Sequence, residues 1–115
     1  MVKDYTKMVD EISQYLGEMG KEKPEVMKGF MNLSKAANAD GALNEKTKEL
    51  IALAIGVSQR CDGCIAFHVK KLVELGATRA ELADMLGVAT YMGGGPTLMY
   101  AADCLRAYDQ FSEQK

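Results

Sequence analysis

The chain of 115 residues has a net charge of −2 and no run of lysine or arginine. A basic face is the usual footprint of nucleic-acid binding, so nucleic acid is excluded as the expected partner. The longest apolar run is too short to cross a bilayer, and the acidic residues within 1–13 do not fit a signal peptide. We therefore expect a cytoplasmic protein with one domain, residues 1–115, whose core needs neither disulfide nor metal to fold.

Apolar residues in the first third of the chain recur every three or four positions, which is the period of an amphipathic helix. The first predicted helix covers residues 3–19, and Gly17 and Gly20 are expected to weaken its end. Pro24 suits the first turn of a second helix, because its missing N–H costs nothing there. The Asn, Asp and Gly residues at 38–41 predict the turn that follows.

The third predicted helix contains the longest apolar stretch of the chain. Asn44 is a good N-cap for it, and it runs to about Gln59. Its second half is apolar all round, which predicts a central, buried element. A fourth helix begins at or near Cys61, and Gly76 is the glycine expected just past its end.

Two further helices complete the chain. Thr78 and Glu81 fit a capping box at the start of the fifth helix, in which each satisfies an end amide of the other. The triglycine at 93–95 then separates the fifth helix from a sixth at about 96–112. Since no segment alternates with period two, the predicted fold is an all-α bundle of about six helices.

The chemistry of the chain concentrates where the third helix meets the fourth. Cytoplasmic thiols are kept reduced, so the C-x-x-C of Cys61 and Cys64 indicates catalysis or metal binding rather than a structural staple. Exposed N–H groups at a helix start stabilise a thiolate. His68 lies one helical turn after Cys64 and is placed to take its proton. Glu49 would orient His68 if the two helices pack antiparallel.

Other interpretations of these residues stay open. The pair could be two ordinary core cysteines, or half of a zinc site with Cys61, Cys64, His68 and the remote Cys104 as the ligands on offer. Glu49 could be a solvated helix acid, and Cys104 fits a core position. The residues also disagree on which thiol reacts first, because the helix dipole favours Cys61 and the nearby His68 favours Cys64.

The whole pattern resembles the alkylhydroperoxidase D-like branch of the carboxymuconolactone decarboxylase-like superfamily. The pattern is an acid, eleven residues and then C-x-x-C-x-x-x-H, here Glu49, Cys61, Cys64 and His68. The resemblance covers roughly residues 30–110. It implies an all-helical homo-oligomer, a trimer or hexamer, with the site near a subunit interface.

The resemblance also implies an activity, namely reduction of a small peroxide through the cysteine pair. Cys64 is then attacked by peroxide, Cys61 closes the disulfide, and His68 with Glu49 relays protons. An outside dithiol, dihydrolipoyl or thioredoxin-like, restores the pair, and neither a cofactor nor a metal is required. The chain departs from the best-studied pattern at Gly63, where that pattern has a second histidine.

Two alternatives accompany this hypothesis. One is a decarboxylase acting on a carboxymuconolactone-like ring, a branch that shares the fold without relying on a cysteine pair. The other is a helical assembly protein without enzymatic activity, whose cysteines bind zinc or sense the redox state.

Overall fold

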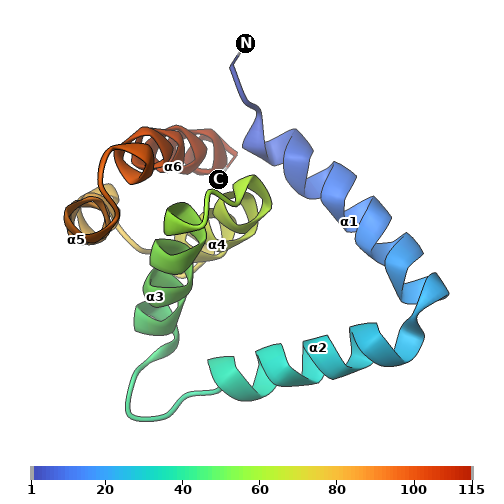
Figure 1. Ribbon diagram of the computed structural model, residues 1–115. Helices are drawn as coiled ribbons and strands as arrows, with labels where there is room; N and C mark the ends of the chain where they lie inside the picture. Colours follow the sequence, from blue (N-terminus) through green and yellow to red (C-terminus); the bar gives the residue numbers. More distant parts are fainter. Residues whose placement is uncertain (1, 115) are drawn as a thin grey trace.

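A computed structural model describes residues 2–114 and contains six α-helices and no strand within them (Figure 1). The predicted all-α fold of about six helices is therefore confirmed. The helices are α1 (Tyr5–Glu22), α2 (Pro24–Asn38), α3 (Glu45–Ser58), α4 (Asp62–Glu74), α5 (Arg79–Gly93) and α6 (Gly95–Glu113).

Side chains and glycines near the helix ends satisfy the backbone groups that the helices leave unpaired. The side chain of Asn44 accepts the N–H of Thr47 at 2.9 Å and caps α3. The capping box predicted for Thr78 and Glu81 is present at the start of α5. Gly76 has a positive φ of 80° and ends α4, as its position in the sequence predicts.

The first helix is longer than the pattern predicts. It continues through Gly17 and Gly20 to Glu22, so the predicted end at residue 19 is wrong. A glycine costs a helix only about 1 kcal/mol, which neighbouring turns can absorb. Pro24 sets the boundary instead, because the residue before a proline is disfavoured in the helical region. Lys23 accordingly takes a non-helical conformation.

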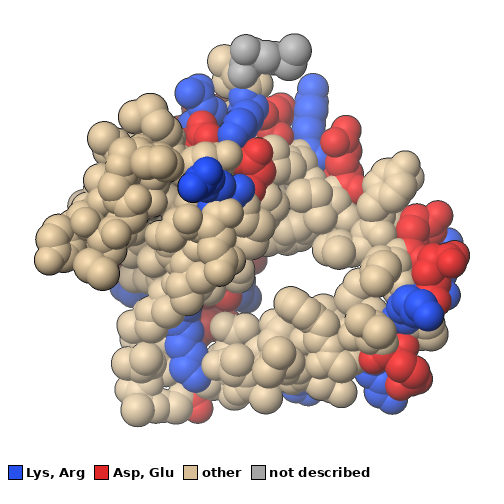
Figure 2. Space-filling view, in the orientation of Figure 1, with Lys and Arg blue, Asp and Glu red and all other residues tan. Residues whose placement is uncertain are grey.

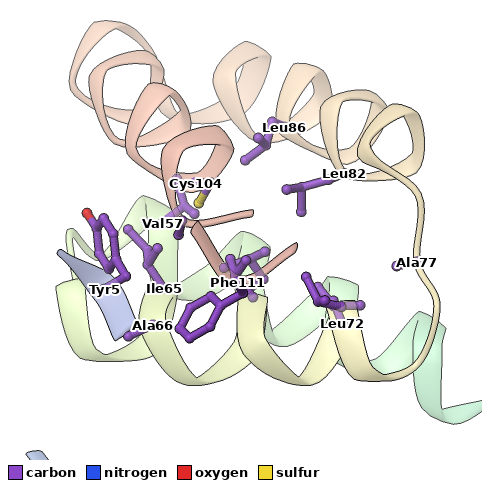
Figure 3. Packing of buried hydrophobic residues seen from close by; sticks show 14 of the residues in the cluster. Tyr5, Val57, Ile65, Ala66, Leu72, Ala77, Leu82, Leu86, Cys104 and Phe111 are labelled. Atoms are coloured by element: carbon purple, nitrogen blue, oxygen red, sulfur yellow. The ribbon is translucent and has the colours of Figure 1, made fainter. Parts of the chain in front are cut away.

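Helices α3 to α6 and the first turns of α1 surround one buried core (Figure 3). Tyr5 packs beside Ile65 of α4, while Leu82 and Leu86 of α5 reach in from the opposite side (Figure 3). The largest fully buried side chains are Tyr5, Leu53, Ile65, Leu72, Leu82, Val57, Val69 and Cys104. This core holds α3 against α4, and the candidate site lies between these two helices.

The rest of α1 and all of α2 form an arm that reaches away from this core (Figure 1). No residue of α2 is buried, and Phe30, Met31 and Leu33 are 58%, 58% and 68% exposed. An opening enclosed by α1, α2 and α3 remains in the space-filling view, so side chains do not close it (Figure 2). The apolar face predicted for the second helix therefore exists but contacts little of this chain.

The third helix also differs from its prediction. Leu53, Gly56 and Val57 are buried, but Ile51 and Ile55 on the outer face are 46% and 54% exposed. The second half of this helix is apolar all round and was predicted to be a buried element, yet one face of α3 is exposed. The physical reason is that no element of the described chain covers that face. None of the helices in residues 2–114 is long and apolar enough to cross a membrane.

Candidate redox site between α3 and α4

The turn between α3 and α4 fixes the position of the first cysteine. Arg60 adopts a left-handed φ of 57°, a conformation in which glycine is usual. Its N–H donates to the carbonyl of Val57 at 3.1 Å, and the N–H of Cys61 donates to the carbonyl of Gly56 at 3.0 Å. These two bonds close the end of α3 and tie the backbone of Cys61 to that helix.

Cys61 is the N-cap of α4 and is joined to Cys64 by a disulfide. Its sulfur accepts the backbone N–H of Cys64 at 3.1 Å. The first N–H groups of a helix carry partial positive charge, so this position favours negative charge on the Cys61 sulfur. Both cysteines are partly exposed. The pair therefore has the exposure and the polarity that a reactive dithiol needs.

A close helix contact places Cys64. A Cβ atom added at Gly56 would lie 2.7 Å from the Cβ of Cys64, closer than side chains tolerate. Only a glycine at position 56 allows α4 to approach α3 this closely. Gly56 therefore sets how near Cys64 lies to the helix that carries Glu49.

The acid and the histidine predicted for the site meet across this contact. A carboxylate oxygen of Glu49 lies 2.6 Å from Nδ1 of His68. Glu49 is only 6% exposed, whereas the His68 side chain is 32% exposed. The bond engages Nδ1, so Nε2 is the ring nitrogen left to exchange a proton. Helices α3 and α4 pack antiparallel, which is the condition on which the predicted role of Glu49 depended. Because Glu49 is buried, the alternative of a solvated helix acid is wrong.

Lys3 and the first half of α1 cover the two residues between the cysteines. Lys3 forms an ion pair with Asp62 at 3.0 Å. A Cβ atom at Gly63 would lie 3.1 Å from the Cδ1 atom of Ile12 on α1. A side chain at this position, such as the histidine of the best-studied family pattern, would require the Ile12 side chain to shift by a few tenths of an ångström. The departure at Gly63 is thus matched by the placement of α1.

The third cysteine belongs to the core. Cys104 is fully buried in α6, and burial, with a smaller contribution from Asp103, raises the pKa of its thiol to about 12. It therefore stays a thiol at neutral pH.

The described part of the chain, residues 2–114, contains no group of three or more His, Cys, Asp or Glu side chains arranged to hold a metal ion. Cys61 and Cys64 are bonded to each other rather than held apart for a metal.

The structure brings together Glu49, Cys61, Cys64 and His68. Two further residues contribute to the site, Gly56 and Lys3, and the sequence pattern did not identify them. Gly56 carries a readable signal, since a glycine inside an apolar helix often marks a close approach. Lys3 carries no such signal, because its partners lie 59 and 100 residues away along the chain.

The fold and the site together define an all-helical protein with a cysteine pair at a helix start. A profile of the carboxymuconolactone decarboxylase family matches residues 24–107, most of the chain. The chain therefore belongs to the carboxymuconolactone decarboxylase family. The superfamily predicted from the cysteine motif is confirmed.

Relatives extend over nearly the full length of the chain. An uncharacterised protein of Cupriavidus necator is 39% identical over 109 residues, covering 95% of this chain and 96% of its own length. Uncharacterised protein 4 in the cox locus of Paracoccus denitrificans is 36% identical over 98 residues, covering 85% of this chain and 88% of its own.

Solved structures show the same fold. A carboxymuconolactone decarboxylase family protein from Legionella pneumophila superposes with a TM-score of 0.92 at 53% identity, covering 94% of this chain and 96% of that one. A family member from Thermotoga maritima superposes with a TM-score of 0.83 at 29% identity, covering 93% and 92%. For the Thermotoga protein an involvement in the antioxidative response has been suggested.

Proposed function

We propose that this protein is a thiol–disulfide oxidoreductase with peroxidase-type, antioxidant activity. The observation that carries the proposal is the disulfide of Cys61 and Cys64 at the start of α4, the helix whose partly exposed His68 is paired with the buried Glu49. This arrangement supplies a reactive thiol, a second thiol within bonding reach and a proton carrier. The suggested role of the Thermotoga relative points to the same chemistry.

The proposed cycle begins with the reduced pair. His68 takes the proton of the Cys64 thiol, and the thiolate attacks one oxygen of the peroxide. The O–O bond breaks, Cys64 becomes a sulfenic acid, and the second oxygen leaves as water or an alcohol after His68 returns the proton. Cys61 then attacks the sulfenic sulfur, the S–S bond forms, and the hydroxyl leaves as water.

Glu49 acts through His68 in this scheme. Its buried carboxylate accepts the Nδ1 hydrogen of the imidazole, which fixes the ring orientation and directs Nε2 to the proton transfer. It also stabilises the imidazolium formed when the ring carries the extra proton. Glu49 is therefore a positioning residue for the proton carrier.

The cycle closes with an outside dithiol. A dihydrolipoyl or thioredoxin-like reductant attacks the Cys61–Cys64 disulfide, passes through a mixed disulfide and leaves oxidised itself. Such reductants work in the cytoplasm, which is the compartment we propose. The proposed partners are thus a small peroxide and a dithiol, with no nucleic acid and no membrane.

We also propose that the working form is a homo-oligomer, a trimer or hexamer. The apolar side chains of α2 support this, because Val26, Phe30, Met31 and Leu33 are each more than half exposed and monomeric proteins rarely expose large apolar patches. A second copy of this chain is the occupant with the matching apolar surface, on the outer face of α3.

The direct test is peroxide consumption driven by a dithiol. Cys64→Ser should reduce turnover to the uncatalysed background, whereas Cys104→Ser, the matched cysteine control, should change it little. Cys61→Ser should stop after one attack and leave a sulfenic acid that a dimedone-type probe maps to Cys64. Full turnover by Cys64→Ser would refute the proposal. Turnover of a carboxymuconolactone-like substrate with both thiols alkylated would favour the decarboxylase alternative instead.

A further inference from the structure

Lys3 and Tyr5, on either side of Asp4, are fastened to α6. The side chain of Gln110 donates to the carbonyl of Lys3 at 2.8 Å and accepts the N–H of Tyr5 at 2.8 Å. The side chain of Tyr5 is fully buried in the core beside Ile65 (Figure 3). These contacts hold the backbone on both sides of Asp4 in one position. Lys3 therefore projects from a fixed point and not from a loose terminus.

The ammonium group of Lys3 lies between two carboxylates. It is 3.0 Å from Asp62, between the cysteines, and 2.9 Å from Asp103 on α6. It also lies 5.0 Å from the ring centre of Tyr100. Hydrogen bonds from Asp103 and, second, from Asp62 hold the pKa of Lys3 well above its usual range. Lys3 thus carries its positive charge throughout the pH range in which thiols titrate.

The negative charge of Asp62 acts on the thiol of the neighbouring Cys61. Asp62 directly follows Cys61, and its carboxylate disfavours a thiolate on the Cys61 sulfur by like-charge repulsion. Lys3 supplies the opposite charge at hydrogen-bonding distance from that carboxylate. The other charged or titratable groups around the turn are Glu49, Arg60, His68, Tyr5, Asp103 and Arg106, the last paired with Asp103 at 3.9 Å. Of these and Lys3, it is Lys3 that forms the hydrogen bond with Asp62.

We propose that Lys3 is a positioning residue of the redox site, which offsets the charge of Asp62 and so sets the reduction potential of the Cys61–Cys64 pair. The inference rests on the proposed function and extends it to the N-terminal segment. Lys3 pairs with Asp62 in the disulfide form as well, but it stabilises the reduced form more, because only there does Cys61 carry negative charge. It thereby makes the pair a better oxidant and Cys61 a better resolving thiol.

The test is the equilibrium of the full-length protein with glutathione. The reduced pair and one oxidised glutathione give the protein disulfide and two reduced glutathione molecules, so atoms and electrons balance. Lys3→Gln should shift this equilibrium toward the protein disulfide by about fivefold to tenfold at pH 8, where a tenfold change corresponds to about 30 mV. Lys3→Arg should restore the parent value, because guanidinium keeps both the charge and the reach.

Two further variants separate charge from structure. Lys21→Gln breaks an ion pair with Glu18 near the far end of α1 and has the same net charge as Lys3→Gln, so it should match the parent. Asp62→Asn should shift the equilibrium in the opposite direction, toward the dithiol, and it tests the idea even if Lys3→Gln fails to fold. The effect of Lys3→Gln should shrink as the pH falls and both thiols stay protonated.

The outcomes distinguish this inference from the proposed function. If one equivalent of peroxide leaves the reduced parent pair unoxidised, the proposed function fails, whatever the position of the glutathione equilibrium. If the parent exchanges and Lys3→Gln gives the same constant at every pH, the role of Lys3 is wrong. A shift in Lys3→Gln that is equal at all pH values, with a lower melting temperature, would show that Lys3 is only structural and would equally overturn the inference.

Discussion

Helices α3 and α2 are both rich in apolar side chains, yet the chain uses them in opposite ways. Against α4, α3 is packed so closely that Gly56 has no room for a methyl group, and Glu49 is 6% exposed. Helix α2 buries no residue, and its Phe30 is 58% exposed. The difference separates two tasks, since a reaction centre needs side chains held rigidly, whereas an assembly surface must stay open until a partner arrives.

The largest expected effect concerns the close contact of α3 with α4, where Glu49 meets His68. Replacing His68 with Asn removes the proton carrier and should lower peroxide turnover by about 10²–10⁴-fold. Glu49→Gln keeps the size of the side chain and removes the charge that orients the imidazole. It should lower turnover by about tenfold to a hundredfold, the equivalent of one charged hydrogen bond.

Steady-state assays with one peroxide and a fixed dithiol concentration check both variants. Replacement of an acid on the arm, Glu18→Gln, is the matched control and should behave as the parent. If Glu49→Gln retained full turnover, the pairing with His68 would be structural, and the assigned relay would be wrong.

A pair of glycine variants tests the packing half of the comparison. Gly56→Ala places a Cβ 2.7 Å from that of Cys64, so it should reduce the free energy of unfolding by about 1–3 kcal/mol. Gly17→Ala on α1 meets nothing within 4 Å and should raise it by about 0.4–1 kcal/mol. Urea unfolding of both variants measures the difference, and effects of the same sign would contradict the close approach of α3 and α4.

A charge introduced on α2 tests whether the exposed apolar face of this helix is an assembly surface. Phe30→Glu should leave the helical circular dichroism unchanged, because Phe30 is 58% exposed and α2 contains no buried residue. It should lower the mass of the assembly measured by light scattering, because a carboxylate in an apolar interface lacks a partner. Lys28→Glu provides the control for charge alone. An unchanged mass for Phe30→Glu would remove α2 from the proposed interface.

The smallest expected effect concerns an exposed acid of the capping box. Lys46, and second the backbone of Thr78, hold the pKa of Glu81 below its ordinary value of 4.5. A lowered folded-state pKa adds stability that is present above the unfolded value and is lost as the pH falls through the folded one. Unfolding of Glu81→Gln should therefore differ most from the parent at neutral pH and converge with it as the pH falls below 4.5 and through the lowered folded-state pKa. A difference that grows in acid would contradict this assignment.

Local signals in the sequence predict the helices well and the contacts between them less well. Asn44 and the Thr78 capping box act on their own helix ends, so neighbouring residues suffice to identify them. The pairing of Glu49 with His68 needed the antiparallel packing of two helices, which the sequence analysis could state only as a condition. Lys3 could not be found, because its contacts with Asp62 and Asp103 exist only after α1, α4 and α6 come together.

The errors have physical causes of the same kind. Uniform apolar character predicted a buried α3, but no described element covers Ile51 and Ile55, so part of the apolar surface remains open. Gly17 and Gly20 do not end α1, since a helix-propensity penalty of about 1 kcal/mol for each glycine is too small to end a helix whose other turns are stable. Both cases show tertiary structure deciding what local patterns leave undetermined.

The most direct test of the central claim is peptide mass spectrometry after one equivalent of peroxide is added to the fully reduced protein. The peptide carrying Cys61 and Cys64 should lose the mass of two hydrogen atoms, while Cys104 remains a free thiol. A cysteine pair that stays reduced while peroxide persists, or oxidation confined to Cys104, would contradict it.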